Sequence, residues 1–327
     1  METIRFSDYM MQVIEDLKAE ERYGTARIYW YALQAFRSFE ETEDIPFDVF
    51  SKAEMKQFEL HLQELERKRN TISTYFRSIR AVYNRAVDDE IIEGEYRLFS
   101  KVFTGVCSEK KLALQAEEMQ ALVDENKDAE VTQAVNASEG MLNARQLLTL
   151  MLLLQGIGFA DLIHLRKEDL RKNGKGTYVL NFRRQKTGTE LNIQVSPEAV
   201  AIINRYRSSA ESNSPYLLCL LDGTKKGEAA YKEYQRQLRN FNYYLARLAM
   251  LCGITTGVSS YTARHTWATL AKFCEVPEEV ISEGLGHSSL DVTRTYLKRF
   301  ESDKLDKANR IIYDYVLNGK QYLWGSL

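Results

Sequence analysis

The chain has 327 residues, with 44 Lys and Arg against 46 Asp and Glu, and a formal net charge of -2 at pH 7. This length favours two domains, and the balanced charge excludes a strongly basic, tail-like nucleic-acid binder. No apolar run approaches the roughly 20 residues needed to span a bilayer, and the amino end shows no signal-peptide core. We therefore expect a cytoplasmic globular protein with no membrane contact.

The cysteines and histidines are dispersed along the chain, four of each type. There is no Cys-x-x-Cys pair and no spacing typical of a zinc site. Reduced cysteines are expected in such a protein. The sequence therefore predicts neither a disulfide framework nor a metal, and no cofactor.

Residues 5 to 103 are predicted to form a run of helices joined by short polar turns. Within residues 25–39, apolar side chains recur at steps of three and four, which predicts a helix with one buried face. The expected members of that face are Ile28, Tyr31, Ala32, Ala35, Phe36 and Phe39. Residues 53–65 and 71–87 show the same period. The sequence therefore predicts a small helical bundle.

The helical period lapses between residues 103 and 116, where we expect an exposed connector. Helices are predicted near residues 117–124 and over the very apolar segment 144–154, which we expect at the centre of a second domain. Residues 178–182 and 190–195 alternate as strands around a turn at 186–189, and helices return from Pro197. The predicted fold class is mainly α with a small antiparallel sheet. The predicted domains are 1–103 and 117–327, with a linker over 104–116.

The near-zero net charge conceals local clusters of basic residues. The first cluster is Arg67, Lys68, Arg69, Arg77, Arg80 and Arg85. Others lie between Arg166 and Lys186 and at Arg236, Arg239 and Arg247. Each cluster taken alone fits a solvated helix face. Together they indicate a DNA-binding surface, and the first supplies the candidate DNA contacts.

The most informative segment runs from Ser260 to Phe300. Ala263–Leu270 is ARHTWATL, Leu285–Ser289 is LGHSS, and Tyr296 follows His287 by nine positions. This order and spacing resemble the tyrosine recombinases, also called phage integrases. The resemblance extends over the whole chain, and it implies an N-terminal helical, SAM-like core-DNA-binding domain followed by a catalytic domain.

The resemblance assigns a role to each motif residue. Tyr296 is the expected nucleophile, because a phosphotyrosyl bond keeps the phosphodiester energy for religation. Arg264 is expected to grip the scissile phosphate, and His287 to donate to it or assist proton transfer. Lys186 matches the family's β-turn lysine, which protonates the leaving 5′-hydroxyl. Taken singly, each of these residues also fits a plain packing or surface role.

Two positions depart from the family pattern. The first catalytic arginine is absent, because Gln155 and Gly158 stand where the family carries it. Tyr261 replaces the first member of the His-x-x-Arg motif and can donate one hydrogen bond without being a cation. Arg145 and Arg166 are candidates to replace the missing guanidinium.

The resemblance implies a site-specific recombinase of a bacterial mobile or invertible element. Its expected partners are double-stranded DNA and further copies of itself, as a homo-tetramer on two DNA sites that is monomeric without DNA. An apolar stripe at residues 305–316 is expected to dock into a neighbouring protomer or to pack on its own domain. One alternative function is a catalytically degenerate DNA clamp. Another is a type IB topoisomerase-like enzyme.

Overall fold

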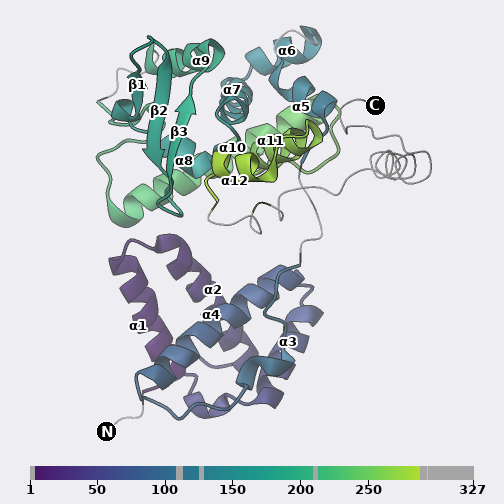
Figure 1. Ribbon diagram of the computed structural model, residues 1–327. Helices are drawn as coiled ribbons and strands as arrows, with labels where there is room; N and C mark the ends of the chain where they lie inside the picture. The colour runs from purple at the N-terminus through teal and green to yellow at the C-terminus, as the bar shows by residue number, and fades with distance from the viewer. Residues whose placement is uncertain (1–3, 108–112, 125–128, 209–212, 288–292, 294–327) are drawn as a thin grey trace, which may run out of the picture. The chain divides into compact units, whose positions relative to one another are not determined.

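The computed structural model describes residues 4–107, 113–124, 129–208, 213–287 and 293. Two compact units make up the chain, residues 1–109 with 226–231 and residues 110–225 with 232–327 (Figure 1). Most of the described chain is helical, and its three strands form one antiparallel sheet, which confirms the predicted fold class. Among the described helices, none has the length and apolar character to cross a membrane.

The first unit is a helical bundle, as predicted. Its helices are α1 (Phe6–Ala19), α2 (Tyr23–Glu40), α3 (Lys52–Glu64) and α4 (Arg69–Asp88), with short 3-10 turns η1 (Phe47–Val49) and η2 (Leu98–Lys101). Aromatic rings fill its centre, where Phe6, Phe36, Phe58 and Phe76 are fully buried. Such rings remove a large apolar area from water and hold the four helices together.

The buried face of α2 differs from the one predicted. Ile28 and Tyr31 are each 42% exposed, whereas Leu33 and Phe36 are fully buried. The expected stripe was therefore correct for its second half and wrong for its first. Apolar residues on both faces of this helix satisfy a three-and-four spacing, and only packing against α1 and α4 selects one of them.

Hydrogen bonds attach each described end of the predicted linker 104–116 to the unit next to it. Asn70 near the start of α4 donates to the Cys107 carbonyl at 2.7 Å and accepts from the Cys107 amide at 2.8 Å. Ser73 donates to the Gly105 carbonyl at 2.6 Å. Leu114 is buried, and its amide donates to Thr266 Oγ1 at 3.0 Å. The domain limits themselves stay a prediction.

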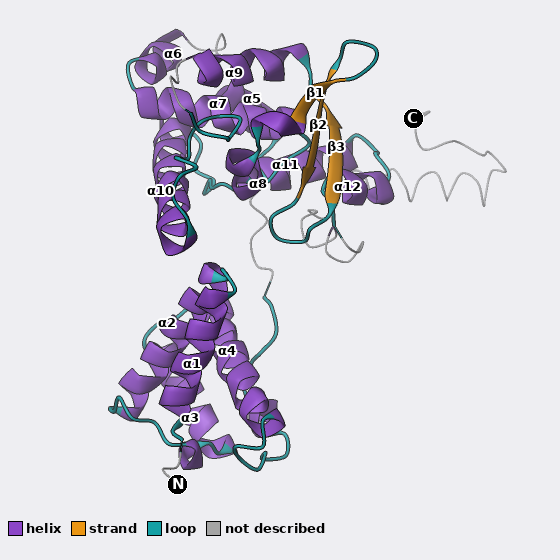
Figure 2. Ribbon diagram, turned by 90° about the vertical axis from the view of Figure 1, so that its left-hand side faces the viewer, coloured by secondary structure: helices purple, strands orange, loops and turns teal. Residues whose placement is uncertain are grey.

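The second unit places helices around the small sheet (Figure 2). Its helices are α5 (Ala116–Val123), α6 (Ala129–Asn136), α7 (Glu139–Leu153), α8 (Phe159–His164), α9 (Pro197–Ser208), α10 (Gly227–Leu251), α11 (Thr262–Phe273) and α12 (Glu278–Gly284), with the 3-10 turn η3 (Lys167–Asp169). The first residues of α10, up to 231, group with the first unit. The apolar helix α7 contacts α5, α6, α9 and α11, which confirms its predicted central place.

The sheet has the strand order β1 (Leu170–Lys172), β2 (Tyr178–Arg183) and β3 (Glu190–Gln194). Leu180 pairs with Ile193 and Phe182 with Leu191, and all four side chains point into the core. The alternation of side chains predicted β2 and β3 correctly. Strand β1 was not predicted, because three residues are too few to show a period.

We expect Phe36→Ala to lower the free energy of unfolding by about 3–5 kcal/mol, because the ring is fully buried between Phe6, Phe50 and Phe58. Ile28→Ala on the same helix should cost less than about 1 kcal/mol, since this side chain is partly exposed. Urea unfolding of the two variants measures the difference. Equal losses would mean that α2 buries the face first predicted from the sequence.

Candidate active site

Arg264 lies in the first turn of α11 with only 3% of its surface exposed. Its Nη1 donates to the Gly156 carbonyl at 3.1 Å, and its Nη2 donates to the Leu285 carbonyl. The same Nη2 lies 2.9 Å from His287 Nε2. The guanidinium therefore joins three separate segments: the turn after α7, helix α11 and the end of α12.

Gly156 allows this close approach. It has a φ of +67°, and a Cβ there would lie 3.1 Å from both Arg264 Cα and Trp267 Cβ. Any other residue would meet both backbone strain and crowding at this point. The glycine thus lets the turn after α7 bring its carbonyl to the Arg264 guanidinium.

His287 follows α12 and is half-buried beside Arg264. Because the guanidinium can only donate, His287 Nε2 accepts, and the ring proton sits on Nδ1, 2.8 Å from Thr293 Oγ1. Burial and the positive charges of Arg264, Arg184 and Lys186 lower the pKa of His287 to about 4. The imidazole of the DNA-free protein is therefore neutral near pH 7.

Lys186 lies exposed in the turn between β2 and β3. The turn is closed by the Arg184 amide, which donates to the Thr189 carbonyl at 2.9 Å. Asp161 of α8 anchors its start, because its Oδ1 accepts from the Gln185 amide at 2.8 Å and its Oδ2 from Arg184 Nε at 3.4 Å. A buried carboxylate therefore positions the strand end that carries Lys186.

The structure thus places Arg264 in contact with His287, and it places Lys186 near enough for its charge to lower the pKa of His287. The roles that the sequence assigns to these residues stay a prediction. Tyr261 precedes α11, is 56% exposed, and has its ring 6.4 Å from the His265 ring. Tyr296 and the apolar stripe at residues 305–316 lie outside the described residues.

Neither candidate replacement for the missing arginine joins this cluster. Arg145 is almost fully buried in α7, where Nε donates to the Leu122 carbonyl at 3.1 Å. Arg166 is exposed, and its backbone forms an isolated bridge with Tyr216. In the described part of the chain, neither side chain hydrogen-bonds Arg264, His287 or Lys186. The sequence pattern placed Arg184 only in the basic cluster between Arg166 and Lys186 and assigned it no part in the site, although it continues the inward side of β2 after Leu180 and Phe182.

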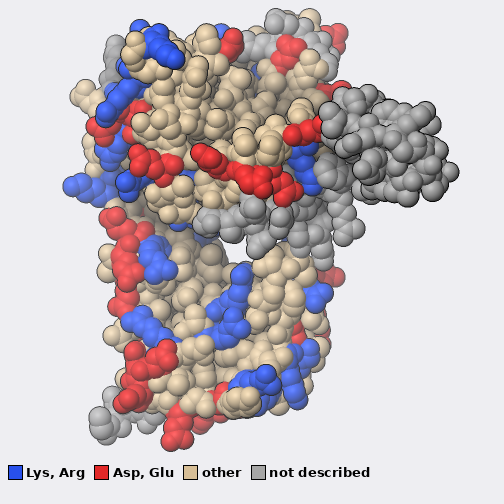
Figure 3. Space-filling view, in the orientation of Figure 1, with Lys and Arg blue, Asp and Glu red and all other residues tan. Residues whose placement is uncertain are grey.

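The predicted DNA-contacting residues lie on or just before α4. Arg67, Lys68, Arg69, Arg77 and Arg85 are exposed, and Arg80 is partly buried. Arg69 stacks on the Phe103 ring, with its Cζ 4.2 Å from the ring centroid. Arg85 pairs with Asp16 at 2.9 Å, so part of its charge is already neutralised. Figure 3 shows acidic and basic side chains interspersed on the visible face of the first unit.

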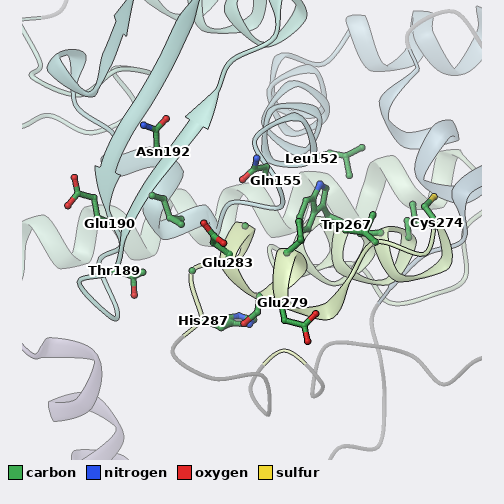
Figure 4. A pocket seen from close by; sticks show the side chains of 18 residues that line it. Leu152, Gln155, Thr189, Glu190, Asn192, Trp267, Cys274, Glu279, Glu283 and His287 are labelled. Atoms are coloured by element: carbon green, nitrogen blue, oxygen red, sulfur yellow. The ribbon is translucent and has the colours of Figure 1, made fainter. Parts of the chain in front are cut away.

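A groove of about 1040 Å³ borders His287 (Figure 4). Its wall is largely apolar and includes Leu191, Trp267 and Val280. Glu279 and Glu283 of α12 also line it. The carboxylates repel a phosphate backbone and the apolar side chains offer it no donor, so this groove suits a protein segment better than DNA. Among the described residues, no group of His, Cys, Asp and Glu could hold a metal ion.

Two family models match the chain. The phage integrase SAM-like domain matches residues 5–102, and the phage integrase family matches residues 114–302. A tyrosine recombinase of Pseudothermotoga lettingae is 34% identical over 21% of this chain and 24% of its own length. Tyrosine recombinase XerC of Staphylococcus saprophyticus is 25% identical over 86% of this chain and 88% of its own.

Solved structures with DNA share the fold at low sequence identity. The XerH recombinase bound to its difH substrate has a TM-score of 0.63 at 14% identity, covering 94% of this chain and 84% of that one. A lambda integrase dimer bound to a core site also scores 0.63, at 13% identity, over 90% of this chain and 98% of that one. These likenesses establish the fold.

The lowered pKa of His287 predicts a pH dependence of stability. The unfolded chain has a histidine pKa near 6.5 and the folded chain one of about 4, so unfolding takes up a proton within that window. The contribution to stability is therefore fully present above pH 6.5 and is lost as the pH falls towards 4. We expect His287→Asn to reduce this loss. Urea unfolding from pH 4 to 8 measures it, and an unchanged pH slope would contradict the assignment.

Proposed function

Because the chain belongs to the phage integrase family, the tyrosine recombinases, we propose that it is a site-specific DNA recombinase acting through a 3′-phosphotyrosyl intermediate. The observation that carries this proposal is the convergence of Arg264, His287 and Lys186. Three groups that can bind or protonate a phosphate lie together beside an apolar groove. A clamp that only binds DNA has no need of this arrangement.

The reaction exchanges one phosphoester for another. Tyr296 Oη forms a bond to the phosphorus while the bond from phosphorus to the 5′-oxygen breaks. Neutral His287 takes the phenol proton on Nε2, which Arg264 Nη2 releases as it turns to the phosphate. Lys186 gives a proton to the departing 5′-oxygen. The reverse steps rejoin the strand to a new 5′-hydroxyl. No cofactor is required, since the phosphotyrosyl bond keeps the energy of the original one.

Arg264 stabilises the charge that gathers on the non-bridging oxygens in the transition state. Its bonds to two carbonyls hold the guanidinium in place before DNA arrives, so only its contact with His287 has to change when the phosphate binds. The incoming phosphate adds negative charge beside His287, which raises the pKa of the imidazole from its DNA-free value. Tyr261 is proposed to donate a hydrogen bond from the start of α11 in place of the family's histidine.

The basic residues of α4 and the segment before it are the proposed contacts to double-stranded DNA. Exposed side chains such as Arg77 can neutralise phosphates, whereas Arg85 would first have to release Asp16. The two solved relatives carry DNA in their structures, in keeping with this proposal. The domain limits 1–103 and 117–327 separate these contacts from the reacting residues.

The proposed assembly is a homo-tetramer on two DNA sites, formed from protomers that are monomeric without DNA. The groove beside His287 supports it, because its apolar wall offers a place for an apolar helix. The stripe at residues 305–316 of a neighbouring protomer is the proposed occupant. A bacterial mobile or invertible element is the proposed genetic setting.

The test is a nicked DNA duplex that carries the terminal sequences of the element encoding the protein. After cleavage, the short fragment between the cut and the nick, which carries the new 5′-hydroxyl, diffuses away. The strand cannot be rejoined, so the covalent intermediate accumulates. We expect a denaturation-resistant adduct with the wild-type chain and none with Tyr296→Phe, which lacks the attacking oxygen. Tyr243→Phe, at an exposed tyrosine of α10, is the matched control and should keep the adduct.

Tight binding of this duplex without an adduct would indicate the catalytically degenerate clamp. Relaxation of supercoiled plasmid without dependence on its sequence would indicate the topoisomerase-like enzyme. An adduct that persists in Tyr296→Phe would place the nucleophile elsewhere.

A further inference from the structure

The site has one guanidinium where the family pattern provides two. Gln155 lines the groove next to Trp267 and Gly284, and Gly158 begins α8 without a side chain. A second cation at the phosphate must therefore come from another element. The Arg145 side chain is bound within the second unit, and exposed Arg166 makes no hydrogen bond to Arg264, His287 or Lys186 among the described residues.

Arg184 directly follows β2, two residues before Lys186, and its side chain is 10% exposed. Strand alternation places it on the inward side together with Leu180 and Phe182, an unusual place for a charged residue. Its Nε donates to Asp161 Oδ2 at 3.4 Å, and its Nη1 donates to the Gly286 carbonyl at 2.8 Å. The guanidinium is therefore fixed from two sides.

Gly286 packs closely against the Arg184 side chain. It has a φ of +60°, and a Cβ there would lie 2.8 Å from Arg184 Cδ. Arg264 binds the carbonyl of Leu285, and Arg184 binds that of Gly286. The two guanidinium groups thus hold adjacent carbonyls just before His287.

The positive charge of Arg184 also acts on the His287 imidazole. Its charge, with those of Arg264 and Lys186, contributes to the lowered pKa of His287. Among the described residues, Asp161 is the ion-pair partner of Arg184. The Arg184 Nε and Nη1 atoms donate hydrogen bonds, whereas Arg184 Nη2 makes none within this part of the chain. One carboxylate facing three cations leaves a net positive site, which suits a phosphodiester anion.

We propose that Arg184 is a catalytic residue that contacts the scissile phosphate and replaces the arginine absent at positions 155 and 158. This assignment rests on the proposed recombinase function. Arg264, on α11, and Arg184, just after β2, then both donate to the non-bridging oxygens of this phosphate. Asp161 is a positioning residue, since it orients Arg184 and the turn of Lys186.

The test compares two versions of the nicked duplex in single-turnover reactions. One carries a normal scissile phosphodiester, and the other a methylphosphonate in which a methyl group replaces one non-bridging oxygen and removes the negative charge. Arg184→Ala should slow adduct formation on the phosphodiester by about 10²–10³-fold. On the neutral methylphosphonate, its rate should come within a few-fold of the wild-type rate.

Arg183→Ala is the matched control. This neighbouring arginine is 76% exposed and pairs with Glu190 at 3.6 Å, so its loss should change neither rate by more than a few-fold. Circular dichroism and binding of the intact duplex show whether Arg184→Ala keeps its fold.

A merely structural role for Arg184 would slow both substrates equally, and that result would overturn the proposal. A phosphodiester rate within threefold of wild type in Arg184→Ala would do the same. Failure of the wild-type chain to form any adduct would refute the recombinase function, and this assignment with it. If the wild-type chain forms the adduct, the recombinase function stands, and the Arg184→Ala rates then test the Arg184 assignment alone.

Discussion

The site is organised by the need to satisfy a buried guanidinium. Arg264 is almost removed from water, and an uncompensated charge there would cost several kcal/mol. The carbonyls of Gly156 and Leu285 and the ring of His287 supply the acceptors. Because these groups come from the turn after α7 and from the end of α12, solvating one side chain fixes the relative positions of three segments.

A second buried charge extends the same logic to the sheet. Asp161 binds both the Arg184 side chain and the Gln185 amide, which ties α8 to the end of β2. Lys186, the proposed general acid, is exposed on the turn that Asp161 anchors in this way. The two arginines bind neighbouring carbonyls, so the helical and sheet parts of the unit meet at the Leu285–His287 segment. Binding of a phosphate would relieve the repulsion among these cations.

Local pattern predicted much of the fold and part of the site. The helical period identified α3 and α4, and alternation identified β2 and β3. Motif spacing pointed to Arg264, His287 and Lys186, which lie near one another in the folded unit, and their roles in the reaction stay a prediction. The buried side of α2 could not be predicted, because both of its faces carry apolar residues. Arg184 was predicted only as one member of a basic cluster, because its place in the site depends on Asp161 and Gly286, which are distant in sequence and meet it only in the folded unit.

In the proposed site, one scissile phosphate receives two guanidinium groups, from Arg264 and Arg184. A crystal or cryo-EM structure of the full chain on its target DNA, captured before cleavage, tests it most directly. We predict nitrogen atoms of both arginines within about 3.2 Å of the non-bridging oxygens of the same scissile phosphate. A complex with Arg264 at that phosphate and Arg184 still directed only to Asp161 and Gly286 would contradict it.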